Sequence, residues 1–142
     1  MGRDASSRVY PLSGVDNGFH PASHHGDKEK NIEEFFSINR YHASLIPYFL
    51  SKLKDIEEAG TTLLDKTMVI YGSPMGDPHV HNHKRCPLLV VGGANGKHKG
   101  GIHYRAKPGT PMANVMLTLL HQLGFEDMTA FGDSTEAFSL KS

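Results

Sequence analysis

Histidine is the residue type in this sequence whose number and spacing could carry chemistry. The chain has 10 histidines among 142 residues, and most of them fall in two short windows, residues 20–25 and 79–83. Imidazole nitrogens bind zinc, iron, manganese and nickel, and they also act as general acids and bases near neutral pH. The clustering therefore indicates either a metal or catalytic site or two solvated polar loops, and both interpretations stay open at this point.

The first window reads His20-Pro-Ala-Ser-His24-His25. His20 and His24 are four residues apart, so a single helical turn would put both rings on one face, where they could bind one metal ion. Pro21 suits the first turn of such a helix, because its missing N–H is not needed there. The alternative is a polar segment ahead of a long helix, with His25 or Asp27 only capping it.

The second window reads Gly76-Asp77-Pro-His79-Val-His81-Asn-His83. In an extended segment, residues two apart point the same way, so the three histidines could converge together with Asp77. The alternative is a solvated loop. The letters His-Asn-His in a row are not a nuclease signature, because no basic surface accompanies them.

The sequence thus predicts a divalent metal ion, zinc or manganese, and it singles out no catalytic residue. The candidate ligands are His20, His24, His25, Asp77, His79, His81 and His83. His98 and His103 are weaker candidates in a Gly- and Lys-rich loop that could cover an anion. His42 and His121 fall inside predicted helices, and we expect structural roles for both.

Apolar residues at three- and four-residue steps predict a long helix over residues 28–59. Asp27 is its expected N-cap and Gly60 its expected stop, while Pro47 predicts a kink or break near residues 43–47. A second apolar stripe predicts a helix over 111–123, capped by Thr110 and ended by Gly124.

Two continuous β-rich runs, residues 67–73 and 87–91, predict strands buried on both faces. A short edge strand is expected over residues 102–105. This order of elements predicts an α/β fold, a part of a layered sheet flanked by helices. Ligands in such sheets bind beyond the carboxyl ends of the strands, which is where the loop 74–86 begins.

The composition excludes some classes of protein. Fifteen Lys and Arg residues balance fifteen Asp and Glu residues, so a nucleic-acid partner, which needs a basic face, is not expected. The apolar stretches fall short of the roughly 20 residues of a membrane helix. We expect one domain over residues 1–142 with an extended lead-in at 1–19, and the chain reads as the C-terminal fragment of a longer protein.

Several motifs in order resemble one bacterial family. The run from His20 to His25, the long helix after it and the loop with Asp77 and His81-Asn-His83 are similar to the HxxSHH-motif family of unknown function (DUF1552). The resemblance covers about residues 15–140. It implies that the chain corresponds to the C-terminal third of a protein of several hundred residues, exported to the periplasm or outside the cell.

A more distant similarity is to the alkaline phosphatase and sulfatase superfamily, which implies a partial alkaline-phosphatase-like sheet and a metal-dependent hydrolase. His20 and His24 match the positions of its Asp-x-x-x-His metal motif, and His81 or His83 matches a later ligand. The departures are His20 in place of the Asp, Pro74-Met75 in place of an Asp-His pair, and the absence of the nucleophile.

The expected function is therefore a divalent-metal-binding part of an alkaline-phosphatase-like or sulfatase-like hydrolase. The fragment alone is expected to be inactive, because nucleophile and metals must act together. The alternative is a non-catalytic module that binds a ligand or partner and keeps a degenerate metal site. An incomplete sheet with unpaired edges also predicts self-association into a homo-oligomer.

Overall fold

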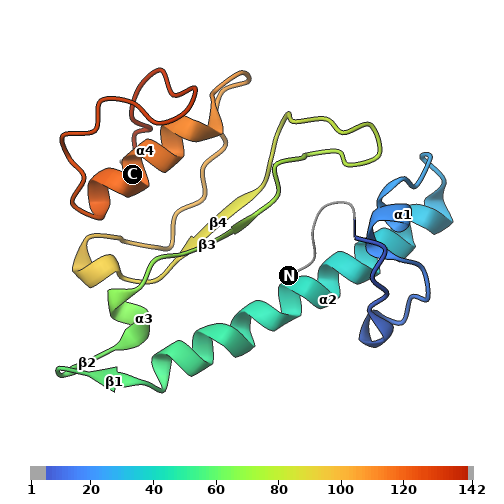
Figure 1. The fold of residues 1–142 in the computed structure, drawn as a ribbon, viewed down its shortest axis with the longest axis horizontal. Helices are drawn as coiled ribbons and strands as arrows, with labels where there is room; N and C mark the ends of the chain where they lie inside the picture. Colours follow the sequence, from blue (N-terminus) through green and yellow to red (C-terminus); the bar gives the residue numbers. More distant parts are fainter. Residues whose placement is uncertain (1–5, 141–142) are drawn as a thin grey trace. The chain divides into compact units, whose positions relative to one another are not determined.

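The computed structural model describes residues 6–140, and these divide into two compact units. The first unit comprises residues 6–52 and 75–83, and the second comprises 53–74 and 84–140. The first unit contains η1 (Pro11–Ser13), α1 (Phe19–Ser23) and most of α2 (Glu29–Lys54). The second contains β1 (Glu57–Glu58), β2 (Thr61–Thr62), α3 (Leu63–Lys66), β3 (Val69–Gly72), β4 (Leu88–Val91), η2 (Ala94–Gly96) and α4 (Met112–Gln122) (Figure 1).

Residues 6–19 are folded back on themselves, so the expected extended lead-in is wrong for this stretch; residues 1–5 lie outside the described part. Tyr10 and Val15 form an antiparallel bridge around the single turn of η1. The carbonyls of Ser6 and Arg8 then accept hydrogen bonds from the first amides of α1. The chain turns because Gly14 adopts φ 76°, a conformation that costs glycine little.

A small apolar core holds the first unit together. Val15, Ala22 and Ile38 are buried, and Tyr10, Phe19 and Phe35 pack against them. Ile38 is fully buried because one side of α2 faces the N-terminal segment. This core fixes α1 on the N-terminal half of α2.

Helix α2 ends earlier than expected and runs unbroken through Pro47, so the predicted break at 43–47 is wrong. Proline removes the hydrogen bond to the carbonyl four residues earlier. That carbonyl belongs to Ala43, which is exposed, as is Pro47. Water can therefore satisfy the freed oxygen, and the helix continues to Lys54.

Gly60 does not end the long helix; it forms the turn of a small hairpin. β1 and β2 pair antiparallel, with Glu58 opposite Thr61. The two residues between them, Ala59 and Gly60, have φ values of 50° and 79°. Positive φ at both central positions is the pattern of a type I′ turn, whose twist matches that of a hairpin.

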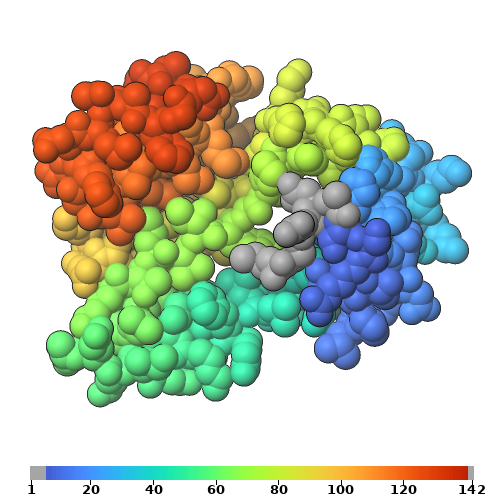
Figure 2. All heavy atoms as spheres, in the orientation of Figure 1, coloured from blue at the N-terminus to red at the C-terminus, as the bar shows by residue number. Residues whose placement is uncertain are grey.

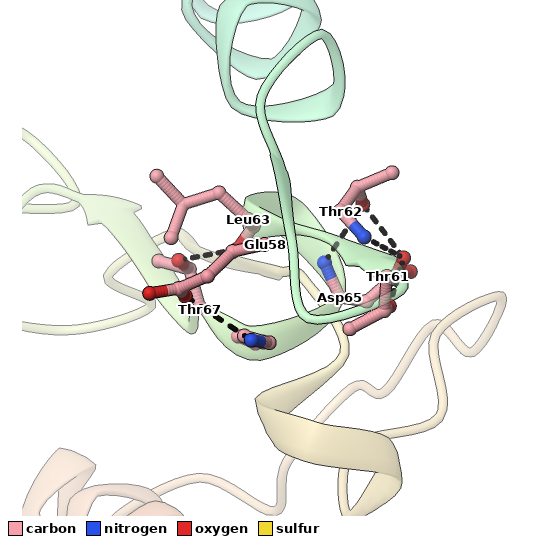
Figure 3. A network of polar contacts seen from close by, with 7 residues as sticks. Glu58, Thr61, Thr62, Leu63, Asp65 and Thr67 are labelled. Carbon is pink, nitrogen blue, oxygen red and sulfur yellow. Dashed lines mark hydrogen bonds and ion pairs between the residues drawn. The ribbon is translucent and has the colours of Figure 1, made fainter.

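Helix α3 begins with a capping box, which Figure 3 shows. The Thr62 hydroxyl accepts from the amide of Asp65, and the Asp65 carboxylate accepts from the amide of Thr62 and from the hydroxyls of Thr61 and Thr62. The Thr62 hydroxyl, followed by that of Thr61, holds the pKa of the Asp65 carboxyl below its usual range. At the other end, the Thr67 hydroxyl donates to the Leu63 carbonyl. Backbone groups at both ends of this four-residue helix are therefore hydrogen-bonded before the chain enters β3.

β3 and β4 pair antiparallel, from Val69 opposite Val91 to Gly72 opposite Leu88. They were expected to be buried on both faces, and this expectation is wrong, because Ile70 and Leu89 are each 44% exposed. The chain is therefore a mixture of helix and short antiparallel strands, which agrees with α/β at the coarse level.

Helix α4 packs against the segment that follows it, because the Thr118 hydroxyl donates to the Phe138 carbonyl and the Phe138 amide donates to the Asn114 carbonyl. Gly124 ends the helix as expected, with φ 100°. Its amide and that of Phe125 donate to the carbonyls of His121 and Leu120, the pair of bonds of a Schellman motif. Thr110 bonds the Lys107 carbonyl instead of capping α4. The strand expected over residues 102–105 is absent, since that stretch is irregular.

Candidate metal site

Helix α1 positions the histidines of the first window. His20 lies inside the helix and His24 immediately after it, and their ring centroids are 4.7 Å apart. Pro21 lies in the first turn, as the sequence predicts. The Ser23 hydroxyl is buried and donates to the His20 carbonyl over 2.7 Å. Ser23 thus closes the turn that places the two rings side by side.

A tight turn connects α1 to α2. Gly26 and Asp27 have φ values of 60° and 56°, and the side chain of Asn31 donates to the His25 carbonyl from the first turn of α2. Asp27 was expected to cap α2, but the helix begins two residues later, at Glu29. The left-handed conformation of Asp27 suits a turn residue rather than an N-cap.

The second window is a closed turn and not the extended segment that the sequence suggested. Asn82 pairs with Asp77 in an antiparallel bridge, and the amide of His81 donates to the Pro78 carbonyl. His81 has φ 51°, so the chain reverses there. Convergence of the histidines therefore comes from a turn and not from a two-residue repeat.

The two windows meet, as expected if both supply ligands to one ion. Nδ1 of His24 lies 3.0 Å from the carbonyl oxygen of His79, and the amide of Gly26 donates to Nδ1 of His79 over 3.3 Å. These two bonds attach the turn of the second window to the residues that follow α1. Figure 2 shows this loop (yellow-green) against the segment around α1 (blue).

Five imidazole rings lie together as a result, each in contact with at least one other; we call them the histidine cluster. The cluster consists of His20, His24, His25, His79 and His81. His24 is central, with its ring centroid 4.9 Å from that of His81 and 6.1 Å from that of His79. His20 and His81 are 6.3 Å apart, and His25 and His79 are 5.0 Å apart.

For His24 and His79, the hydrogen bonds indicate which ring nitrogen carries the proton. A carbonyl only accepts, so Nδ1 of His24 is the donor, and the neutral ring has its lone pair on Nε2. Nδ1 of His79 accepts from an amide, so its neutral ring carries the proton on Nε2. In the neutral rings, Nε2 of His24 therefore carries an electron pair, and Nε2 of His79 is a hydrogen-bond donor.

His25 resembles His79 in this respect. Its Nδ1 accepts from the amide of Asp27 over 3.1 Å, while the Asp27 carboxylate lies 3.5 Å away. The two contacts require different protonation states. The amide bond is the shorter one and has hydrogen-bond geometry, so Nδ1 of His25 is the acceptor. The His25 side chain is also only 12% exposed, which favours an internal role.

The remaining candidates differ in their surroundings. Asp77 accepts from the amide of His79 through its carboxylate, and His83 is an exposed residue at the end of the loop. Within residues 6–140, no group of three or more His, Cys, Asp or Glu side chains already has the arrangement of a formed metal centre. The rings are gathered, but their nitrogens do not yet point at one position.

Two histidines of the second unit have hydrogen-bonded roles. Nδ1 of His98 contacts the side-chain oxygen of Gln122, and Nε2 of His121 contacts the Met128 carbonyl. The loop after β4 was a possible cover for an anion. Its amides at Gly93 and Ala94 instead donate to carbonyls of Leu64 and Thr67, which leaves those amides unable to cradle an anion.

His42 has a structural environment, as expected. Its ring packs edge-on against Tyr10 at 4.4 Å and near Phe19 at 5.3 Å. Burial among these rings lowers the pKa of His42 below its usual value, because desolvation disfavours the charged imidazolium.

The chain matches no protein-family model, no curated protein and no solved structure. The family resemblance carried by the HxxSHH motif therefore stays a prediction. Across the part of the chain that the structure describes, no helix is long and apolar enough to cross a membrane.

Proposed function

We propose that the histidine cluster binds a divalent transition-metal ion, zinc or manganese, and that the chain is the metal-binding part of an alkaline-phosphatase-like or sulfatase-like hydrolase. The observation that carries the metal proposal is the contact of the His24 ring with the rings of both His20 and His81. Histidines from two sequence windows are thereby brought together.

The ring spacing supports this proposal. Zn–N bonds of about 2 Å at tetrahedral angles put the centroids of two imidazoles on one ion about 5 Å apart. The corresponding distances are 4.7 Å for His20 with His24 and 4.9 Å for His24 with His81, and the third pair is wider at 6.3 Å. A shared ion would require the nitrogens of these three rings to turn toward one position.

The protonation pattern of His24 also favours metal binding. A metal-ligating histidine usually donates its other ring N–H to a carbonyl or carboxylate, which fixes the ring. His24 makes such a bond to the carbonyl of His79. His24 and His81 are exposed, so an ion can reach them from solvent.

The hydrolase part of the proposal rests on the family resemblance. A complete enzyme of that kind needs a nucleophile beside the metal, and the resemblance gives this chain none. We therefore expect the chain to bind metal without catalysing hydrolysis. The alternative, a non-catalytic module that binds a ligand or partner and has only a degenerate metal site, predicts a chain that purifies metal-free and keeps its stability in chelator.

Calorimetric titration with zinc and with manganese at pH 7.5 tests the metal proposal. The expected result is binding by the native chain, its loss in the His20→Ala/His24→Ala double variant, and unchanged binding in His103→Ala, which removes an exposed histidine from the second unit. Binding should also weaken in more acidic solution, because protons compete with the metal ion for imidazole. Equal heats from the native chain and the double variant would refute the site.

A further inference from the structure

The turn that carries the second window is closed by backbone bonds around Asp77. The amides of Gly76 and Asp77 donate to the Asn82 carbonyl, and the amide of Asn82 donates back to the Asp77 carbonyl over 2.8 Å. The carboxylate of Asp77 accepts from the amide of His79 over 3.0 Å. This bond spans two residues, as in an Asx turn, and it fixes the direction of the His79 peptide.

The His79 peptide and ring are both used to hold the first window. The carbonyl accepts from Nδ1 of His24, and Nδ1 of the ring accepts from the Gly26 amide. The proton on His79 is therefore on Nε2, the nitrogen that would otherwise be free for a metal. The same turn presents the ring of His81 to His20 and His24.

We infer that His20, His24 and His81 are the ligands of the proposed metal site, and that Asp77 and His79 are positioning residues that hold His24 and His81 in place. This inference rests on the proposed function. It divides the candidate residues by what their atoms already do. Nε2 of His24 offers an electron pair, Asp77 accepts the amide hydrogen that maintains the turn, and His79 accepts the one that attaches the turn to Gly26.

Two matched pairs of variants separate positioning from ligation. Asn at position 77 keeps an oxygen that can accept from the His79 amide, but it lacks the charge of a carboxylate ligand. Asn at position 79 places its side-chain oxygen near the position of Nδ1, so it can accept from Gly26, but it has no equivalent of Nε2. Ala at either position removes both properties.

The experiment measures zinc dissociation constants by competition with a chromophoric chelator. Asp77→Ala and His79→Ala should weaken binding about 10- to 100-fold, the usual effect of losing a group that orients a ligand. Asp77→Asn and His79→Asn should restore binding to within about threefold of the native chain. His81→Ala, which removes a ligand, should weaken binding more than either Ala positioning variant.

Two spectroscopic readouts accompany the affinities. The visible spectrum of the cobalt-loaded chain should be the same in Asp77→Asn and His79→Asn as in the native chain, because the ligand set is unchanged. Nitrogen chemical shifts should show His24 protonated on Nδ1 with and without zinc, and Asp77→Ala should broaden or shift this signal.

The outcomes distinguish the two proposals. If the native chain binds no zinc, the proposed function fails, while the His24 shifts in the metal-free chain still test the positioning contacts. If the native chain binds zinc but Asp77→Asn or His79→Asn weakens it as much as Ala does, that residue is a ligand and the inference is overturned. A changed cobalt spectrum in an Asn variant would overturn it as well.

Discussion

Nδ1 of His24 donates a hydrogen bond to the backbone carbonyl of His79 across 55 residues of sequence. The side chain of one window is thus bound to the main chain of the other. Because the acceptor is a backbone oxygen, substitution of the His79 side chain leaves it in place. This hydrogen bond joins the two sequence windows. The backbone conformation of each window therefore determines whether the histidine cluster forms.

The stability of the first unit should depend on pH through His42. Burial lowers the pKa of this ring, so below about 6.5 the unfolded chain binds a proton that the folded chain resists. Stability is then full above about pH 6.5 and is lost as the pH falls toward the lowered folded pKa. His42→Phe keeps an aromatic ring beside Tyr10 and cannot titrate.

Denaturant unfolding at pH 7.5 and 5.5 measures this effect. The native chain should lose more unfolding free energy between the two values than His42→Phe does. A direct check is the titration of the His42 ring proton by NMR, which should have its midpoint below that of free histidine. A midpoint at or above the free value would contradict the expectation.

The segment after α4 should be released by a single substitution at Asn114. This side chain is 1% exposed, accepts from the amide of Thr135 and donates to its hydroxyl. Asn114→Ala removes both hydrogen bonds to Thr135, each worth about 0.5–1.5 kcal/mol. Amide hydrogen exchange should rise in residues 131–138, whereas Asn17→Ala, at an exposed residue, should leave exchange there unchanged.

The end of α4 should be sensitive to a side chain at Gly124. Its φ of 100° lies in the region that L-residues adopt rarely, so Gly124→Ala should destabilise the chain by about 1 kcal/mol or more. Gly100→Ala is the matched control, because a Cβ there meets open space and no left-handed φ is required. Thermal unfolding of both variants decides it: similar midpoints would exclude strain at Gly124.

The helices were largely predictable because their signals are local. The apolar stripe of α4, the Gly124 stop and the short turn around His20 and His24 follow from neighbouring residues. The errors in α2 also have local causes, but the pattern of residue types does not show them. Pro47 was expected to interrupt the helix, but exposure of the freed carbonyl removes most of its cost. Gly60 lies in the turn between β1 and β2 and does not end a helix.

The strands and the cluster were harder to predict in detail. A run such as Leu88–Val91 is equally apolar in a buried parallel strand and in a short antiparallel hairpin, so the sequence did not distinguish them. The candidate ligands were identified by residue type, and their meeting was predicted. The roles of the His79 carbonyl and the Gly26 amide were not, because every residue has a backbone and no letter in the sequence marks these two.

The first unit is discontinuous in sequence, since residues 75–83 belong to it while residues 53–74 belong to the second. A ribosome therefore makes α1 and α2 well before the loop that attaches to them, and β3 emerges in between. Until residue 83 has left the ribosomal exit tunnel, His20 and His24 cannot contact His79 and His81. Closing so long a segment costs conformational entropy, so we expect the cluster to be among the last parts of the first unit to form during synthesis.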